Sequence, residues 1–183
     1  MEKIPTILLR NPDNRSSVLM EINPGCEWVL NGEGEATRKY DGTCIMFDGT
    51  SWWARREVKP GKETPANFVQ IVLDENTGKI QGWEPIDQSP FAKPAQEATD
   101  KLENPVIGTY ELVGPKIQGN PENYESHEVV LHDTAERIPA NALTISEMVD
   151  LVRGLPEAWE GIVWHHPDGR MAKLKKRDLK EVN

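Results

Sequence analysis

The most informative stretch of this 183-residue chain is Lys39-Tyr40-Asp41-Gly42, which follows Ala36-Thr37-Arg38. It lies where one predicted strand gives way to the next. As an isolated string it is weak, because ordinary residue frequencies produce Lys-x-Asp-Gly often enough for a surface lysine beside a turn to explain it. Lys39 therefore gains meaning only from the motifs that follow it along the chain.

Four further motifs follow in order, and with the first they span most of the chain. They are Arg55-Arg56, Thr109-Tyr110-Glu111-Leu112-Val113-Gly114, Glu160-Gly161-Ile162-Val163-Trp164 and Lys173-Leu174-Lys175. The series resembles motifs I, Ia, III, IV and V of the covalent nucleotidyltransferase superfamily, which contains ATP-dependent DNA and RNA ligases and mRNA capping enzymes. Each motif is short, but five motifs in this order are specific.

Within that superfamily, two stretches resemble the small RNA ligases, a group that includes a vertebrate 5′-to-3′ RNA ligase. They are residues 39–44 (KYDGTC) and 111–121 (ELVGPKIQGNP), and a His132-Asp133 pair after an apolar strand fits the same pattern. The resemblance implies an α+β nucleotidyltransferase (ligase adenylation-domain) fold, in which two antiparallel sheets with flanking helices enclose an ATP cleft.

The resemblance makes Lys39 the nucleophile that attacks the α-phosphate of ATP. A lysine titrates near ~10.4 when free, so it must lose its charge to attack, and neighbouring cations or a metal favour that loss. Lys173 and Lys175 alternate on a predicted strand and therefore point to one face, from which both can reach the α-phosphate. The alternative for these two lysines is a solvated strand face.

The remaining motif residues acquire roles from the resemblance. Glu160 resembles the motif IV glutamate that helps to hold Mg²⁺ or Mn²⁺ through water, and Asp41 is a second candidate for that hydrated shell. Glu111 resembles the motif III glutamate that accepts hydrogen bonds from the ribose hydroxyls. Arg55 resembles the motif Ia arginine near the same sugar, and the adjacent Arg56 points the opposite way if the strand is regular.

Two positions depart from the family pattern or leave it open. His132 has the only flat side chain in the stretch where relatives stack an aromatic on adenine, but a histidine satisfied in the core is an equal alternative. Arg38 stands where many RNA ligases carry a glutamate that contacts adenine. The resemblance is therefore least informative about how the protein selects the adenine base.

Short strands dominate the rest of the chain, bounded by turn signals such as Asp48-Gly49 and Pro167-Asp168-Gly169. A helix is predicted to begin at Pro94 within residues 93–102, and a second one to run from a Thr144 or Ser146 cap to about Arg153. Residues 60–67 and 114–126 are predicted loops. The predicted strands are Ser17–Ile22, Thr43–Phe47, Trp52–Val58, Phe68–Leu73, Val106–Val113, Glu128–His132, Gly161–His165 and Arg170–Lys176.

Bulk properties narrow the class of protein. The net charge of −9 argues against a protein that coats nucleic acid, yet residues 170–180 form a run of cations with a single anion, which suits a site for phosphates or else a solvated tail. Cys26 and Cys44 have no metal-ligand spacing and are predicted to be free thiols, with a disulfide as the alternative. No apolar run approaches the roughly 20 residues of a membrane span, so the expected location is the cytoplasm.

The sequence thus predicts a single domain over residues 1–183. It is expected to act as a monomeric, ATP-dependent RNA ligase that joins RNA ends carrying 5′-phosphate and 3′-hydroxyl groups through a lysyl-AMP intermediate. No C-terminal OB domain, which DNA ligases and capping enzymes normally carry, is expected, because the chain ends eight residues after Lys175. Lys176, Arg177 and the loop around Lys62 are then the candidates to orient pyrophosphate. The rival hypotheses are a small ATP-dependent DNA ligase and an inactive module that binds nucleotides or RNA ends.

Overall fold

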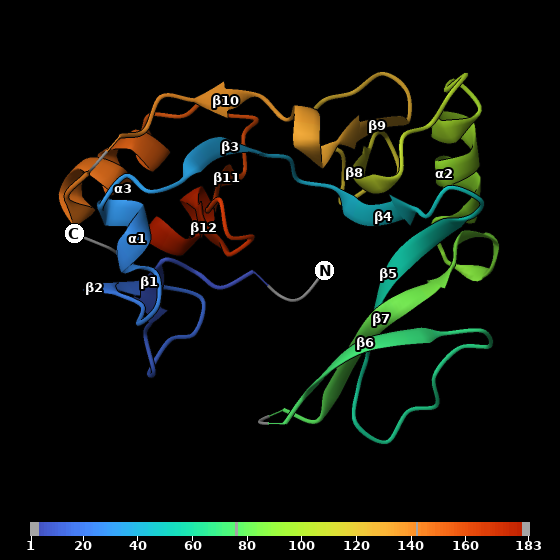
Figure 1. Cartoon of the computed structure of the whole chain (residues 1–183), viewed down its shortest axis with the longest axis horizontal. Helices are drawn as coiled ribbons and strands as arrows, with labels where there is room; N and C mark the ends of the chain where they lie inside the picture. Colours follow the sequence, from blue (N-terminus) through green and yellow to red (C-terminus); the bar gives the residue numbers. More distant parts are fainter. Residues whose placement is uncertain (1–3, 76, 142, 181–183) are drawn as a thin grey trace. The chain divides into compact units, whose positions relative to one another are not determined.

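The computed structural model describes residues 4–75, 77–141 and 143–180, and the chain divides into two compact units (Figure 1). The central unit contains residues 41–134. The terminal unit combines residues 4–40 with residues 135–180, so it is built from both ends of the chain. The chain passes between the units directly after Tyr40, which places Lys39 at the end of the first segment of the terminal unit.

The central unit is a six-stranded antiparallel sheet with a helix packed on it (Figure 1). Its strand order is β6-β7-β5-β4-β8-β9, and helix α2 contacts β9. One face buries a core around Ile45, Tyr110 and Leu112, against which Ala95 and Ala98 of α2 pack. The elements are β4 (Thr43–Phe47), β5 (Trp52–Val58), β6 (Val69–Asp74), β7 (Lys79–Pro85), η1 (Ile86–Gln88), α2 (Ala92–Thr99), β8 (Gly108–Val113), β9 (Glu128–Leu131) and η2 (His132–Thr134).

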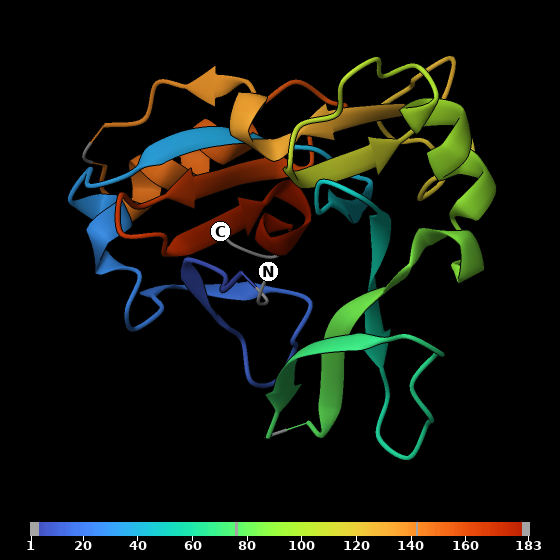
Figure 2. The same ribbon diagram turned by 45° about the vertical axis from the view of Figure 1, so that its right-hand side comes forward.

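The terminal unit contains a four-stranded antiparallel sheet of order β10-β3-β11-β12, in which β3, β11 and β12 lie side by side (Figure 2). Its core combines Ile162 and Trp164 of β11 with Met148 and Val152 of α3. The elements are β1 (Leu8–Arg10), β2 (Val18–Ile22), α1 (Glu27–Leu30), β3 (Glu35–Lys39), β10 (Arg137–Ile138), α3 (Ile145–Arg153), β11 (Gly161–His165), β12 (Met171–Lys175) and η3 (Lys176–Leu179).

The first described residues attach to the outer edge of this sheet. Thr6 forms a parallel bridge with Lys173, the Ile7 N–H donates to the Lys173 carbonyl at 2.9 Å, and the Lys173 N–H donates to the Pro5 carbonyl at 2.9 Å. The start of the chain therefore runs along β12 before it enters the small β1-β2 sheet. This pairing brings residues 5–7 beside β12.

Most predicted elements are confirmed. Strands β4, β5 and β11 have the predicted bounds, the Asp48-Gly49 turn joins β4 to β5, and residues 60–67 and 114–126 contain no helix or strand. Thr144 is the cap of α3: its side chain accepts from the Glu147 N–H, and the Glu147 carboxylate accepts from the Thr144 N–H. Cys26 and Cys44 are free thiols.

Three predictions are wrong in detail. The described residues form three sheets instead of two, because residues 8–22 make the separate β1-β2 pair. Helix α2 begins at Ala92, two residues before Pro94, since a proline is tolerated throughout a first turn whose N–H groups have no helical partner. Strand β9 ends at Leu131, and His132 opens the 3₁₀ turn η2. The predicted turn at Asn76-Thr77-Gly78 includes Asn76, which lies outside the described residues. The single domain stays a prediction.

Candidate active site

Three adjacent strands of the terminal unit bring Lys39 and Lys175 to one row of the sheet. In the register of β3, β11 and β12, Lys39 lies opposite Gly161, and Gly161 lies opposite Lys175. Side chains of directly opposed residues point to the same face. The two lysines therefore flank a position with no side chain, although 136 residues separate them in the sequence (175 less 39).

Glu160 joins the two lysines. Its Oε2 accepts from Lys39 Nζ at 2.5 Å and its Oε1 accepts from Lys175 Nζ at 2.5 Å. The carboxylate side chain is 6% exposed, and the guanidinium of Arg177 lies 3.7 Å from Oε1. We call Lys39, Glu160 and Lys175 the lysine cluster. One carboxylate balances only one of its two ammonium groups, so the cluster carries an excess positive charge.

The electrostatics of the cluster follow from burial and this excess charge. Burial raises the pKa of Glu160, but the charge on Lys39 and the hydrogen bond from Lys175 outweigh it, and the pKa of the carboxyl lies below its ordinary value. Burial, followed by the charge on Lys39, lowers the pKa of Lys175 against the opposing effect of Glu160. The cluster therefore keeps Glu160 ionised and makes the proton on Lys175 easier to lose.

Gly161 permits the close approach of β11 and β12 at this point. A Cβ atom added there would lie 2.1 Å from the Leu174 carbonyl oxygen and 2.8 Å from the Lys175 Cα atom. These are backbone atoms, which a rotamer change cannot move. Any residue other than glycine would push β12 away, and Lys175 with it.

Lys173 lies on the same face as Lys175, as predicted from their spacing. It is opposite Val163, which is opposite Thr37, whereas Leu174 and Ile162 point into the core. Lys173 is partly exposed, and Lys175 is 9% exposed. The two lysines therefore differ in environment, since Lys175 belongs to the buried cluster and Lys173 is partly exposed.

The guanidinium of Arg38 contacts two aromatic rings, and each ring belongs to a residue adjacent in sequence to a member of the lysine cluster. Its guanidinium lies 4.3 Å from the ring centroid of Tyr40 and 4.6 Å from that of Trp159. Tyr40 directly follows Lys39, and Trp159 directly precedes Glu160. Arg38 thus connects the chain segment that carries Lys39 with the segment that carries Glu160.

In the central unit, Glu111 and His132 come together. Glu111 is 9% exposed; its Oε1 accepts from the Gly42 N–H at 3.1 Å, and its Oε2 lies 3.0 Å from His132 Nε2. The other ring nitrogen of His132 lies 2.8 Å from Thr109 Oγ1. Both residues were predicted to belong to the site, but the Glu111–His132–Thr109 chain of hydrogen bonds was not predicted, since it depends on the pairing of β8 with β9.

The sheet register of the central unit separates Arg55 from Arg56. Cys44 lies opposite Glu111, and the neighbouring pair Ile45–Ala54 belongs to the core face. Arg55, next to Ala54, therefore shares the face of Glu111, and its guanidinium donates to Gln81 Oε1. Arg56 projects from the opposite face and lies 3.8 Å from the Glu84 carboxylate. The prediction that the two arginines point to opposite faces is confirmed.

The described residues are poorly suited to hold a resident metal. They include no group of three or more His, Cys, Asp and Glu side chains arranged around a common point. Both oxygens of Glu160 already accept from lysines, and the Asp41 backbone N–H donates to Glu122 Oε1 at 2.8 Å. Glu122 is a buried partner of the Asp41-Gly42 turn that sequence reasoning missed, because 81 residues separate it from Asp41. The metal roles of Glu160 and Asp41 stay predictions, through water rather than by direct ligation.

Comparisons with known proteins give a weak likeness to solved structures of an RNA ligase. No protein-family model and no curated protein sequence match this chain. Among solved structures, it is similar to a mutant RNA ligase from Naegleria gruberi with ATP and Mn, at 16% identity and a TM-score of 0.44, over 84% of this chain and 53% of that one. A mutant of the same ligase with AMP and Mn gives 16% identity and a TM-score of 0.40, over 80% and 50% of the two chains. An apo mutant gives 15% identity and a TM-score of 0.41, over 80% of this chain and 50% of that one.

The chain spans about half the length of these solved proteins. At such TM-scores the likeness is loose, and the residues of the site carry the functional argument. No helix in the described part of the chain has the length and apolar composition of a membrane span.

Proposed function

We propose that this chain is an ATP-dependent RNA ligase whose Lys39 becomes covalently adenylated. The observation that carries the proposal is the lysine cluster: two lysines from distant motifs meet at one buried carboxylate over a glycine. A solvated strand face would hold its lysines apart and exposed. Two cations and a buried anion in one row instead suit a nucleophile beside a group that stabilises developing phosphate charge.

The first step transfers AMP to Lys39. The Nζ atom attacks as the free amine, the N–P bond to the α-phosphorus forms, and the bond from phosphorus to the bridging oxygen breaks, so that its electron pair leaves with pyrophosphate. Two protons leave Nζ, one before the attack and one after it. Glu160 Oε2 already accepts from Nζ and is their path to solvent. Lys175 stays cationic and stabilises charge on the α-phosphate.

The following steps join the RNA ends. The 5′-phosphate of one strand takes AMP from Lys39, and the 3′-hydroxyl of the other displaces AMP to form the phosphodiester. Mg²⁺ or Mn²⁺ enters with the substrate, bound to the phosphates of ATP. Glu111, His132 and Arg55 are assigned to adenosine by the family resemblance, and the choice of RNA over DNA rests on the resemblance of residues 39–44 and 111–121 to small RNA ligases.

The proposal is tested by incubation with α-labelled ATP and Mg²⁺ or Mn²⁺, followed by denaturing electrophoresis. We expect label on the wild type and none on Lys39→Ala or Lys39→Arg, because arginine keeps the charge but supplies no free amine. Lys79→Ala, which removes an exposed lysine paired with Glu57, is the matched control and should label normally. A phosphoramidate is identified by loss of label in acid and its retention in alkali.

Absence of label with either metal would refute the proposal and favour a binding module without chemistry. Preference for α-labelled GTP would indicate a capping enzyme. Label on the wild type with sealing of nicked DNA, and no sealing of nicked or single-stranded RNA, would indicate the DNA ligase.

A further inference from the structure

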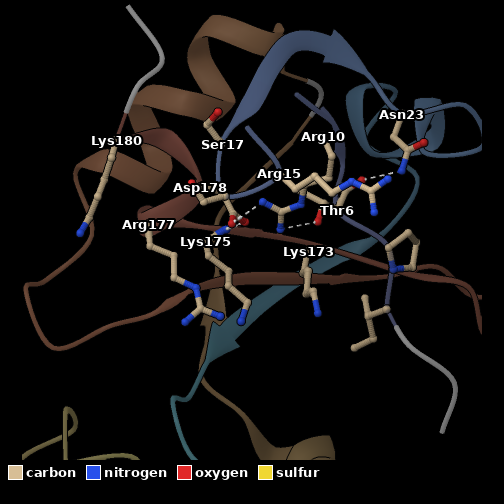
Figure 3. A pocket seen from close by; sticks show the side chains of 13 residues that line it. Thr6, Arg10, Arg15, Ser17, Asn23, Lys173, Lys175, Arg177, Asp178 and Lys180 are labelled. Carbon is tan, nitrogen blue, oxygen red and sulfur yellow. Dashed lines mark hydrogen bonds and ion pairs between the residues drawn. The ribbon is translucent and has the colours of Figure 1, made fainter. Parts of the chain in front are cut away.

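The terminal unit also contains a basic pocket of about 960 Å³, which Figure 3 shows from close by. Six of its side chains are cationic and one is acidic. The cations are Arg10, Arg15, Lys173, Lys175, Arg177 and Lys180, and the acid is Asp178. Sequence reasoning found only the cations after residue 170, because the two arginines lie more than 150 residues earlier in the chain.

The folding of the chain ends explains why these residues meet. Residues 5–7 run along the outer edge of β12, so Arg10 at the end of β1 comes beside the turn η3 that follows β12. There Arg10 Nη1 donates to Asp178 Oδ1 at 2.8 Å and Nη2 donates to Thr6 Oγ1 at 3.1 Å. Asp178 is 2% exposed and the Arg10 side chain is 37% exposed, so this half-buried ion pair joins β1 to η3.

The pocket has a strong excess of positive charge. Arg10 pairs with Asp178, and Lys175 pairs with Glu160 of the lysine cluster. The lining still contains six cations and one acid, in a protein whose net charge is −9. Like charges in a concave, low-dielectric wall concentrate the electric field within the pocket and raise the local concentration of anions. Arginine side chains, which supply three of the six cations, also match the oxygens of phosphate with two parallel hydrogen bonds.

The pocket shares Lys175 with the lysine cluster, so an anion inside it would lie beside the lysine that is hydrogen-bonded to Glu160. Arg177 also lines the pocket and lies 3.7 Å from Glu160 of the lysine cluster. Lys176, in contrast, is not among the pocket residues: its Nζ donates to the carbonyls of Pro156 and Glu157. Of the two adjacent residues expected to orient pyrophosphate, only Arg177 reaches this pocket.

We propose that this pocket binds the phosphate chain of ATP: the β- and γ-phosphates before Lys39 attacks, and pyrophosphate afterwards. The proposal rests on the proposed function and adds the residues that stabilise the leaving group. When the bond from the α-phosphorus to the bridging oxygen breaks, the electron pair and the new negative charge pass to pyrophosphate, and Arg15, Arg177 and Lys180 balance that charge. Cations gathered around one pocket suit a short phosphate chain, whereas an RNA strand would need a longer groove lined with cations.

The test compares two reactions of one enzyme. The first is pyrophosphorolysis, in which pyrophosphate attacks isolated adenylated enzyme and releases ATP. The second is sealing of pre-adenylated RNA, which uses neither ATP nor pyrophosphate. Arg15→Gln and Lys180→Gln each remove one exposed cation outside the lysine cluster. We expect each to raise the KM for pyrophosphate by about tenfold, the loss of one charge-assisted hydrogen bond, and to leave sealing unchanged.

Arg137→Gln is the matched control, because Arg137 is an exposed arginine of the same unit, lies outside the pocket and pairs with Glu35. It should behave as the wild type in both reactions. Slower sealing by Arg15→Gln and Lys180→Gln with an unchanged KM for pyrophosphate would overturn the proposal and assign the pocket to RNA. No change in either reaction would overturn it as well.

A calorimetric titration separates this proposal from the ligase proposal. Unmodified wild type is titrated with inorganic pyrophosphate and tripolyphosphate, and Arg15→Gln is titrated in parallel. Binding by the wild type that weakens about tenfold in Arg15→Gln supports the pocket even if Lys39 takes no label. Absence of binding by wild type that does take the label would refute the pocket and leave the ligase proposal intact.

Discussion

At the scale of single residues, Glu160 is the group on which the site depends. It is buried, both of its oxygens accept from lysines, and each lysine belongs to a different sequence motif. Removing one partner of a buried ion pair leaves the others without compensation, which costs more than the pair itself contributes. Glu160 therefore holds β3, β11 and β12 in the arrangement that Lys39 needs.

Glu160→Gln should lower the free energy of unfolding by about 3 kcal/mol at neutral pH. The folded-state pKa of Glu160 is below its ordinary value, so its contribution is fully present above the ordinary glutamate pKa of about 4.3 and is lost as pH falls through the folded-state pKa. Urea unfolding of both proteins from neutral to acid pH should show a gap that narrows below about pH 4. Glu157→Gln, which alters an exposed glutamate nearby, should show no such gap, and a gap for Glu160→Gln that stays constant into acid would refute this assignment.

Arg38→Lys keeps the charge beside Lys39 but removes the planar group between Tyr40 and Trp159. Cation–π contacts contribute about 0.5–2 kcal/mol each, so we expect the free energy of unfolding to fall by about 1–2 kcal/mol. Because Tyr40 and Trp159 adjoin Lys39 and Glu160, kcat for adenylation should fall severalfold with little change in the KM for ATP. Arg137→Lys serves as control. If Arg38→Lys instead raised only the KM for ATP, Arg38 would contact the nucleotide directly.

At the scale of elements, β11 is the strand that organises the site. It lies between β3 and β12, begins directly after Glu160, and has a glycine where the two flanking lysines are opposed. Its other residues alternate between the core and the face of Lys173. A single strand thus sets both the spacing of the lysines and the position of their shared carboxylate.

Gly161→Ala should destabilise the protein by about 3 kcal/mol, since its Cβ would meet backbone atoms at 2.1 and 2.8 Å. Adenylation should fall further than stability alone explains, because β12 must move and carries Lys175. Chemical unfolding and the labelling assay at a temperature where the variant is folded measure the two effects. Gly154→Ala, with ordinary φ and its nearest contact at 3.3 Å, is the control and should label normally. Normal labelling by folded Gly161→Ala would show that the lysine spacing is not critical.

At the scale of the molecule, positive charge is concentrated in one pocket although the net charge of the chain is negative. The chain carries −9 overall, yet six of its 21 lysine and arginine residues line one pocket of the terminal unit. Long-range repulsion of a nucleotide by the whole protein and short-range attraction by the pocket therefore oppose each other. At 0.1 M ionic strength, salt screens exposed charges that lie more than about 10 Å apart. Salt dependence therefore distinguishes the long-range repulsion from the short-range attraction.

If the pocket binds the phosphates of ATP as proposed, the KM for ATP in adenylation should rise with salt, because Arg15, Arg177 and Lys180 are exposed. Arg15→Gln should have a higher KM at low salt and a shallower rise, since it has one fewer ionic contact to lose. Arg137→Gln should follow the wild type. Parallel salt dependence of the wild type and Arg15→Gln would mean that Arg15 makes no contact with the phosphates.

The sequence by itself determined the local features of this protein. Alternating apolar residues and turn signals placed most strands, Thr144 and Glu147 marked the start of α3, and a two-residue spacing put Lys173 and Lys175 on one face. Each of these depends on neighbours within a few residues, where backbone geometry decides the outcome. The order of motifs likewise singled out Lys39, Glu111, Glu160 and the two lysines.

Only the tertiary structure decided which of these residues meet. The pairing of β3, β11 and β12 makes Glu160 a partner of both Lys39 and Lys175, and the pairing of residues 5–7 with β12 brings Arg10 and Arg15 to a pocket with Lys173. Arg38, an exception to a motif in the sequence, becomes a contact between Tyr40 and Trp159. The physical reason is that strand order and register arise from burial of side chains over the whole chain, which no local pattern records.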